Sequence, residues 1–228
     1  MSASVDNNLL DTVILESAPN PQAAVIWMHG LGADGNDFVP IVEELDLSGC
    51  APIRFVFPHA PQIPVTINGG YVMRAWYDIL TTDLVRREDE GGLRQSQQAI
   101  EQLIAAQIAQ GIPTNKIVLA GFSQGGAMTL QTGLRYPEKL AGMIVLSAYA
   151  PLIDTLAAEC APANKRTPIF MAHGTHDPIV PHARGSASRD ALVQLGYQIE
   201  WHDYPMQHSV CWEEVQAIGQ YLQQVLPG

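Results

Sequence analysis

An apolar run that ends in a serine between two glycines constrains this chain more than any other stretch. The run covers residues 117–121, and Ser123 follows it within the pattern Gly121-Phe122-Ser123-Gln124-Gly125. A helix-compatible segment begins directly afterwards, so a buried strand must turn sharply into a helix at the serine. Glycines remove the Cβ atoms that would collide in such a turn. The stretch predicts a nucleophile elbow with Ser123 as the nucleophile, as against a glycine-rich turn with an incidental serine.

Apolar runs alternate with amphipathic segments along the rest of the chain. Strands are expected at residues 11–16, 23–28, 53–57, 116–121, 142–147, 168–174 and 197–204, the first of them at a sheet edge. Helices are expected at residues 38–45, 92–110, 124–135, 184–195 and 211–226. Runs that are apolar on both faces are typical of parallel strands covered by helices on each side. The pattern predicts an α/β fold, with a mostly parallel central sheet and helices on both faces, in a single domain over residues 1–228.

Length and charge narrow the class of protein. The chain has 228 residues, of which 47% are hydrophobic, enough to bury a substantial core. Its net charge of −11 argues against nucleic acid or an anionic membrane as a partner. We expect no stable membrane insertion, because no apolar stretch reaches the length of a span. The absence of a leader-like start and the three cysteines without a C-x-x-C pattern indicate a cytoplasmic protein.

A catalytic serine needs an imidazole to take its proton and a carboxylate to orient that imidazole. In hydrolases with this elbow, the acid and then the histidine follow the serine, in loops at the C-terminal ends of later strands. His208 lies between the last expected strand and the closing helix, which is the position of the base. The other histidines that follow the serine and precede His208 are His173, His176, His182 and His202. They fall at a strand end, in a loop, at a helix start and within a strand, so we predict His208 as the base.

Asp177 is the predicted acid. It follows the expected strand that ends at His173, in a tight loop that Pro178 stiffens, at the same edge of the sheet as the serine. Asp154 and Glu159 lie in a less suitable connection, and Asp203 is still within the last strand. An Asp-Pro pair also initiates turns, and both roles can hold at once.

Two other chemistries could use residues of this region. His173, His176 and Asp177 could suggest a metal site, but they lack the helical spacing of H-E-x-x-H and a well-placed third ligand, so no metal is expected. Cys211 could suggest a thiol nucleophile. It lies on the wrong side of the base, in the closing helix, and is interpreted as a packing residue.

The glycine-rich loop over residues 29–37 follows a buried strand and lacks both the Walker lysine and the G-x-G-x-x-G spacing. We therefore expect it to present a backbone N–H to the active site rather than to bind a phosphate. The candidate is the N–H of Leu31. The N–H of Gln124, at the start of the helix after the serine, is the second expected donor of an oxyanion hole.

A long segment from residue 59 to about residue 90 is rich in proline, glycine and aromatic residues. A loop of this length inside a compact domain is usually functional, so we expect it to form one wall of a substrate cleft. Trp76, Ile79 and Leu80 are the expected apolar lining. Simple core packing is an equally good interpretation of Trp76.

Taken in order, these motifs resemble a known family. They are His29-Gly30-Leu31-Gly32, Pro58-His59-Ala60-Pro61, Ala75-Trp76-Tyr77-Asp78, Gly121-Phe122-Ser123-Gln124-Gly125-Gly126, His173-Gly174 with Asp177, and His208. Over nearly its full length the chain resembles the small phospholipase/carboxylesterase family, which includes bacterial carboxylesterases and acyl-protein thioesterases. The resemblance implies an α/β-hydrolase fold without a large cap domain, no cofactor, a triad of Ser123, Asp177 and His208, and an oxyanion hole at Leu31 and Gln124.

The function expected from the resemblance is that of a serine carboxylesterase. It would hydrolyse short- to medium-chain acyl esters, small-molecule or lipid-like, through an acyl-enzyme, and it would form homodimers. The alternative is an acyl-protein thioesterase or a lysophospholipase. Thioesterases more often carry a Gly-Asp-Thr/Ser run where this chain has Ala33-Asp34-Gly35-Asn36, which favours the general esterase. A more remote alternative is a non-catalytic binding protein with this fold, but no triad member is missing.

Overall fold

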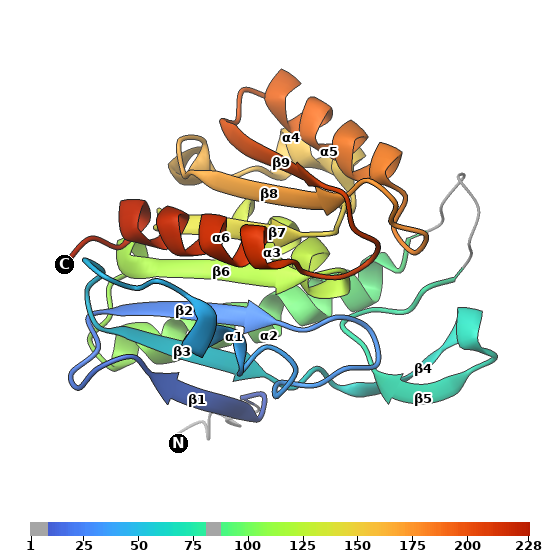
Figure 1. Cartoon of the computed structure of the whole chain (residues 1–228). Coiled ribbons are helices and arrows are strands. Elements are labelled where there is room, and N and C mark those ends of the chain that lie inside the picture. The colour runs from blue at the N-terminus through green and yellow to red at the C-terminus, as the bar shows by residue number, and fades with distance from the viewer. Residues whose placement is uncertain (1–8, 81–87) are drawn as a thin grey trace, which may run out of the picture.

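The computed structural model describes residues 9–80 and 88–228. A seven-stranded sheet in the order β1-β3-β2-β6-β7-β8-β9 forms the centre of the molecule (Figure 1). Every neighbouring pair from β3 to β9 is parallel, and β1 joins β3 antiparallel at one edge. The predicted edge strand and the predicted fold class, an α/β-hydrolase sheet without a large cap domain, are both confirmed.

The bounds of the elements lie close to the predicted ones. The strands of the sheet are β1 (Thr12–Glu16), β2 (Ala23–Met28), β3 (Ile53–Pro58), β6 (Ile117–Phe122), β7 (Gly142–Leu146), β8 (Ile169–Gly174) and β9 (Ile199–Tyr204). The helices are α1 (Ile41–Glu44), α2 (Glu90–Ala109), α3 (Gln124–Gly133), α4 (Ile153–Glu159), α5 (His182–Gln194) and α6 (Trp212–Val225).

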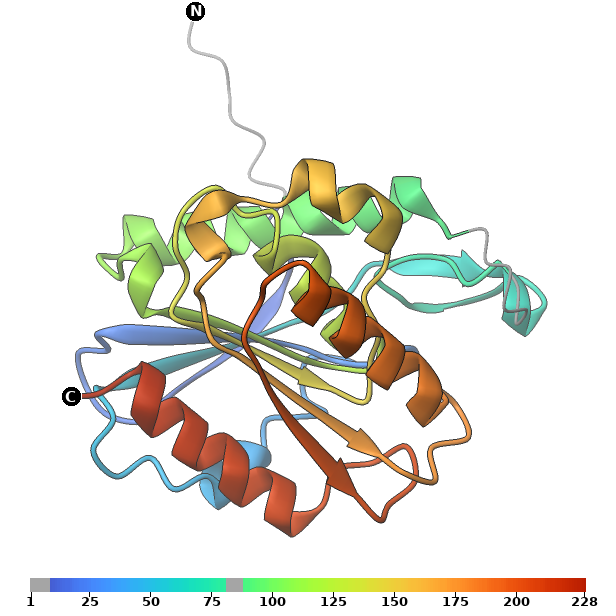
Figure 2. The same cartoon turned by 90° about the horizontal axis from the view of Figure 1, so that it is seen from above.

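Successive side chains of the buried strands supply two separate cores. Ile26 and Leu119 pack on one face, with side chains of α2, α3, α4 and α5. Val25 and Val118 pack on the other face, with side chains of α1 and α6. Figure 2 shows the two helical layers on either side of the sheet. All six residues of β2 are buried, which explains why this strand is continuously apolar instead of alternating.

A β-hairpin lies within the segment that was predicted as one long loop. β4 (Gln62–Val65) and β5 (Tyr71–Arg74) pair antiparallel and extend beyond the main sheet (Figures 1 and 2). Between them, a 3-10 turn over Thr66–Asn68 is followed by Gly69 at φ 68° and Gly70 at φ 78°, conformations that favour glycine. The part of the predicted loop at residues 81–87 lies outside the described residues.

One predicted helix is shorter than expected, and one helix was not predicted. The helix expected over residues 38–45 begins only after Pro40, because a proline disfavours helical backbone in the residue that precedes it. α4 was not predicted, because the stretch that holds Asp154 and Glu159 was interpreted only as a connection. Within residues 9–80 and 88–228, no helix combines the length and apolar character of a membrane span.

Candidate active site

Ser123 occupies a strained turn between β6 and α3. Its backbone has φ 56° and ψ −118°, a conformation that non-glycine residues rarely adopt. A Cβ atom on Gly121 would lie 2.2 Å from the carbonyl carbon of Gly125, and one on Gly125 would lie 2.1 Å from the oxygen of Met28. Both distances are far shorter than any real contact, so glycine is required on each side of the serine. The steric reason predicted for the two glycines is confirmed.

Asp177 and His208 form a hydrogen-bonded pair at the carboxyl ends of neighbouring strands. His208 Nδ1 lies 2.7 Å from Asp177 Oδ2, and the Asp177 side chain is fully buried. The other oxygen, Oδ1, accepts the N–H groups of Ile179 at 2.8 Å and Val180 at 2.9 Å. A carboxylate can only accept from Nδ1–H, so the proton lies on Nδ1 and Nε2 is left free to take a proton from elsewhere.

The base lies against the residue that precedes the serine. The rings of Phe122 and His208 are 4.6 Å apart between centroids, with a tilt of 45°. Phe122 ends β6, and His208 lies in the connection between β9 and α6. The parallel sheet thus collects the elbow, the acid loop and the base loop at one edge, as expected for ligand sites in open α/β sheets.

Two backbone N–H groups beside Ser123 are available to bind an oxyanion. A Cβ atom on Gly30 would lie 3.4 Å from the Cβ of Ser123, so the loop that carries Leu31 lies directly against the serine. Gln124 is the first residue of α3, where helical N–H groups have no partner in the helix. Within the part of the chain that the structure describes, neither the Leu31 nor the Gln124 N–H makes a hydrogen bond.

The Gln124 side chain fixes the segment that follows β5. Its Oε1 accepts the backbone N–H of Trp76 at 2.9 Å, and its Nε2 donates to the carbonyl of Tyr77 at 2.8 Å. The Trp76 indole N–H in turn donates to the carbonyl of His29 at 2.9 Å. The two loops with the candidate oxyanion donors are therefore held together before any substrate binds.

His29 fixes the peptide that carries the Leu31 N–H. Its Nδ1–H donates to the carbonyl of Gly30 at 2.7 Å, and its Nε2 accepts the N–H of Ala60 at 3.0 Å. Burial lowers the pKa of His29, which keeps the ring neutral in this tautomer. The Gly30 carbonyl and the Leu31 N–H belong to one planar peptide unit, so holding the first orients the second. Sequence reasoning gave His29 no separate role, because only the partners of its two nitrogens identify one.

The predicted apolar lining divides into a buried residue and two partly exposed ones. Trp76 is only 1% exposed and belongs to the core, which supports its interpretation as a packing residue. Ile79 and Leu80 are half-buried, and the Ile79 carbonyl accepts the N–H of Ile67 at 3.0 Å. A role for Ile79 and Leu80 in binding an acyl chain stays a prediction.

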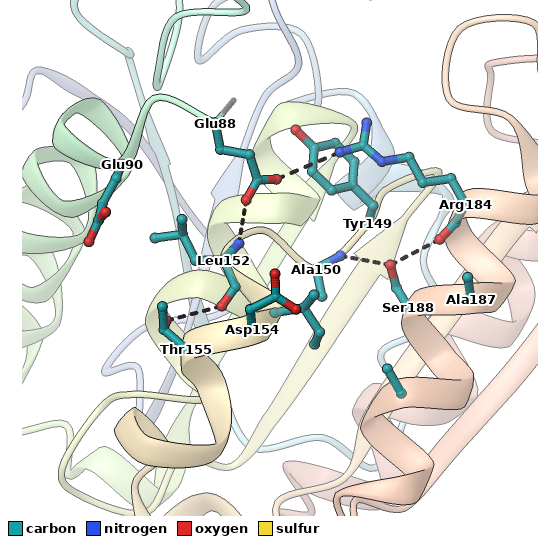
Figure 3. A pocket seen from close by; sticks show the side chains of 12 residues that line it. Glu88, Glu90, Tyr149, Ala150, Leu152, Asp154, Thr155, Arg184, Ala187 and Ser188 are labelled. Carbon is teal, nitrogen blue, oxygen red and sulfur yellow. Dashed lines mark hydrogen bonds and ion pairs between the residues drawn. The ribbon is translucent and has the colours of Figure 1, made fainter. Parts of the chain in front are cut away.

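A cavity of about 550 Å³ lies between α4, α5 and the start of α2 (Figure 3). Tyr149 lines it, and the hydroxyl groups of Tyr149 and Tyr77 are 2.8 Å apart, so these two tyrosines connect the cavity wall to Gln124. The Arg184 guanidinium lies over the Tyr149 ring at 3.1 Å and 3.7 Å from a carboxylate oxygen of Glu88. The volume falls in the range of small-ligand sites. The sequence did not predict this cavity, because its walls come from separate connections.

Metal and thiol chemistry find no geometric support in the described parts of the chain. Across residues 9–80 and 88–228, no three His, Cys, Asp or Glu side chains are grouped to hold a metal ion. Cys211 is the N-cap residue of α6, where burial raises the pKa of its thiol and so opposes thiolate formation.

Comparison with known proteins adds independent information. The family model described as phospholipase/carboxylesterase matches residues 10–226. Acyl-protein thioesterase 1 of Neurospora crassa is 45% identical over 220 residues, which cover 90% of this chain and 87% of the relative. The protein of the same name from Gibberella zeae is 40% identical over 224 residues, covering 94% and 95%.

Solved structures agree with the sequence matches. SOBER1 of Arabidopsis thaliana superposes with a TM-score of 0.85 at 32% identity, covering 90% of this chain and 99% of that one. Acyl-protein thioesterase 2 of Zea mays has a TM-score of 0.85 at 26% identity, covering 95% and 99%. The fold, the strained serine and the relatives all indicate a hydrolase of ester or thioester bonds.

Proposed function

Because this chain belongs to the phospholipase/carboxylesterase family of ester hydrolases, we propose that it is a serine thioesterase that removes fatty acyl groups from S-acylated polypeptides. The observation that carries the serine chemistry is the Asp177–His208 hydrogen bond of 2.7 Å, at the sheet edge that also holds the strained Ser123. The names of the relatives supply the thioester substrate.

The relatives favour this alternative over the carboxylesterase expected from the sequence. That expectation rested on the departure at Ala33-Asp34-Gly35-Asn36, which has a local explanation. Asp34 Oδ1 accepts the Asn36 N–H at 2.7 Å, and the Gly35 N–H donates to His59 Nδ1 at 3.0 Å. Ala33 also donates its N–H to the Gly30 carbonyl at 3.3 Å, so this turn supports the peptide that carries the Leu31 N–H, and the departure leaves that candidate donor in place.

The first half of the reaction forms an acyl-enzyme. His208 Nε2 takes the proton of the Ser123 hydroxyl as the oxygen attacks the thioester carbonyl. The N–H groups of Leu31 and Gln124 hold the negative oxygen of the tetrahedral intermediate, and Asp177 stabilises the imidazolium. The carbon–sulfur bond then breaks, and His208 gives the proton it took from Ser123 to the leaving sulfur, which departs as a thiol and leaves the imidazole neutral. A cysteine thiol has an ordinary pKa of about 8.5, so this leaving group needs less help from the acid than an alkoxide does.

The second half releases the fatty acid. His208 takes a proton from a water molecule, which attacks the acyl-enzyme carbonyl, and the oxyanion returns to the same two N–H groups. Collapse of the intermediate expels Ser123, which recovers its proton from His208. This cycle consumes one water and uses no cofactor. Assembly as a homodimer and a cytoplasmic location stay predictions.

The test compares S-acyl peptides with oxygen esters of the same chain length, in the wild type and in Ser123→Ala. We expect kcat/KM to be higher for the thioesters and to fall by several orders of magnitude for both substrates in Ser123→Ala. Ser209→Ala, at an exposed serine beside the base, is the matched control and should retain full activity.

Each rival function gives a different result in this assay. A preference for oxygen esters would return the carboxylesterase to first place, and activity confined to lysophospholipids would favour a lysophospholipase. Acyl-ligand binding without turnover in the wild type would favour a non-catalytic binding protein. Activity that survives in Ser123→Ala would contradict the proposed nucleophile.

A further inference from the structure

His173, at the end of β8, makes polar contacts that the reaction as described does not use. Its side chain is 1% exposed. Burial lowers its pKa, so the ring is neutral and carries a single proton. Nε2 lies 2.8 Å from the carbonyl oxygen of Val180, which can only accept, and therefore Nε2 holds that proton. The same nitrogen is 3.5 Å from Asp177 Oδ2, the oxygen that binds His208.

Val180 is held from both sides by this arrangement. Its N–H donates to Asp177 Oδ1 at 2.9 Å, and its carbonyl accepts from His173. The loop of residues 177–180 is thus closed by the hydrogen bond to the Asp177 carboxylate, and the hydrogen bond from His173 fixes it to the sheet. Without the His173 N–H, the Val180 carbonyl loses its hydrogen bond. Val180 can then move, and its own N–H no longer holds the Asp177 carboxylate in one orientation.

The ring of His173 cannot turn away from this position. A Cβ atom on Gly185 would lie 2.4 Å from its Nδ1, so α5 packs directly on the ring edge. The Trp201 ring is stacked against it at 6.2 Å, and the His182 ring meets it edge-on at 5.8 Å. The charged or titratable groups that act on His173 are Asp177, His182 and His208.

The next residue supports the base loop. A Cβ atom on Gly174 would lie 2.3 Å from the carbonyl oxygen of Gln207 and 2.5 Å from that of Met206. The N–H of His176 also donates to the Met206 carbonyl at 3.1 Å. The end of β8 therefore contacts both loops. The His173 side chain binds the acid loop, and Gly174 lets the base loop pack directly on the strand because it has no side chain.

We propose that His173 is a positioning residue for the catalytic pair: its Nε2–H fixes the Asp177 loop and lies beside Asp177 Oδ2, which sets how strongly the carboxylate attracts His208. The proposal rests on the proposed triad. A donor close to a carboxylate lowers its basicity. Removing that donor strengthens the attraction between Asp177 and the protonated form of His208, and it loosens the loop that aims the carboxylate.

The experiment uses three substitutions at one position. His173→Gln places an amide N–H close to the original Nε2, His173→Asn places its amide near Nδ1 and short of Val180, and His173→Leu removes the donor at similar size. kcat/KM is measured from pH 5 to pH 9 on the best acyl substrate, with folding checked by circular dichroism. We expect His173→Leu and His173→Asn to lose about tenfold in kcat/KM, the equivalent of one hydrogen bond, mostly in kcat.

The pH profile separates positioning from a general loss of stability. The acid limb, where His208 becomes protonated, should move to higher pH in His173→Leu and His173→Asn and return towards the wild type in His173→Gln. Folded His173→Leu with an unshifted limb and wild-type kcat would overturn the proposal. An inactive wild type would instead overturn the proposed function, so the two failures are distinguishable.

A measurement on the unaltered protein covers the case in which the variants do not fold. Nitrogen-15 imidazole NMR identifies which nitrogen of each histidine carries a proton. We expect His173 to carry a proton on Nε2 alone from pH 7 to pH 9. A proton on Nδ1 instead, or a second proton within this range, would overturn the proposal.

Discussion

Single residues decide whether the elbow can form at all. Ser123 adopts its strained backbone because the glycines on either side leave room for the turn, and the neighbouring strand end fills that room. Gly125 rests on the carbonyl oxygens of Met28 and His29, at the end of β2 and the start of the oxyanion loop. The packing of Gly125 on these oxygens therefore positions the turn that holds the nucleophile against the loop that carries the Leu31 donor.

Gly125→Ala should be strongly destabilising. The added Cβ would lie 2.1 Å from the Met28 oxygen, and backbone cannot give way as a flexible side chain can. We expect a loss in unfolding free energy at or above the roughly 1–3 kcal/mol that is typical of overpacking, measured by urea unfolding. The control is Gly91→Ala in α2, where the nearest atom would be 3.7 Å away, and which should gain up to about 1 kcal/mol. Equal effects of the two substitutions would contradict the steric account of the elbow.

The triad candidates could be chosen from sequence because each follows a recognisable strand. Asp177 and His208 lie where their order and flanking elements place them, and their hydrogen bond agrees with that choice. His29 and His173 could not be given roles in the same way, since the partners of a ring nitrogen are fixed by tertiary contacts. His173 is bonded to Val180, seven residues on, and His29 to Ala60, thirty-one residues on.

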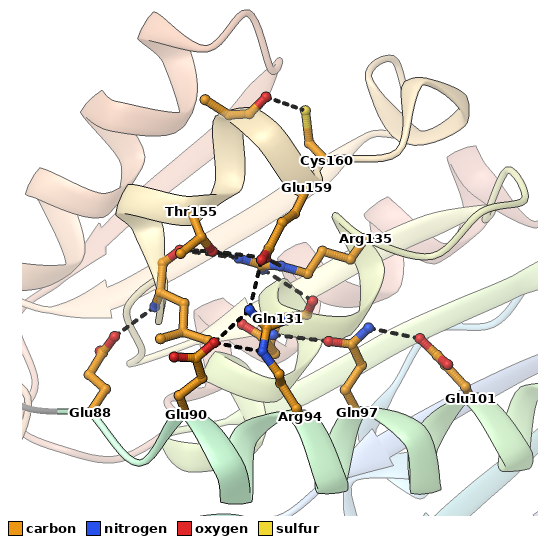
Figure 4. A network of polar contacts seen from close by, with 12 residues as sticks. Glu88, Glu90, Arg94, Gln97, Glu101, Gln131, Arg135, Thr155, Glu159 and Cys160 are labelled. Carbon is orange, nitrogen blue, oxygen red and sulfur yellow. Dashed lines mark hydrogen bonds and ion pairs between the residues drawn. The ribbon is translucent and has the colours of Figure 1, made fainter.

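At the scale of elements, a polar network joins α2, α3 and α4 (Figure 4). Glu159 of α4 lies 2.7 Å from Arg135, which follows α3, and 2.7 Å from Arg94 of α2. The Arg135 side chain is only 5% exposed, so the pair is partly screened from water. α4 forms part of the wall of the cavity in Figure 3, and this network fixes α4 to α2 and α3.

The elements themselves were predictable only where periodicity was strong. The buried strands and α2 were found because their apolar pattern is long and regular. β4 and β5 were missed because each has four residues, Pro64 interrupts the first, and both contain exposed residues. α4 was missed because seven residues with a single buried side chain, Leu156, give no helical pattern.

Glu159→Gln should lower stability in a pH-dependent way. The hydrogen bond from Arg135 is the main cause that lowers the Glu159 pKa from 4.5 to about 2. A carboxyl whose pKa is lower in the folded state stabilises that state above pH 4.5, and this contribution is lost as pH falls towards 2. The stability difference between the wild type and Glu159→Gln should therefore shrink from pH 5 to pH 2. Glu138→Gln, at an exposed site, is the control, and a difference that is constant with pH would contradict the network's role.

At the scale of the whole molecule, the chain has a net charge of −11 and still buries an acidic residue that forms no ion pair with the described residues. Glu214, in the first turn of α6, is 0% exposed, and neither of its carboxylate oxygens has a hydrogen-bond partner among the described residues. Burial raises the pKa of Glu214 to about 8. The folded protein therefore holds this proton at neutral pH.

Glu214→Gln should change the pH dependence of unfolding in the opposite sense to Glu159→Gln. Between pH 4.5 and about 8 the folded state binds the proton and the unfolded state does not, so wild-type stability falls as pH rises. The neutral amide removes this penalty, and Glu214→Gln should gain on the wild type across this window and level off above it. Urea unfolding from pH 5 to pH 9 measures the difference. Glu213→Gln, at the exposed neighbour, should show no such trend, and parallel curves for wild type and Glu214→Gln would rule out the buried proton.

The central claim is that Ser123 carries the acyl group between the two halves of the reaction. The most direct measurement mixes the protein with an S-acyl peptide, quenches the reaction in acid within milliseconds, and determines the intact mass and the modified tryptic peptide. We predict a mass gain of one acyl group on the peptide that contains Ser123, which is retained in Ser209→Ala and lost in Ser123→Ala. An acyl group on Cys211, or undiminished turnover and acylation in Ser123→Ala, would contradict the account.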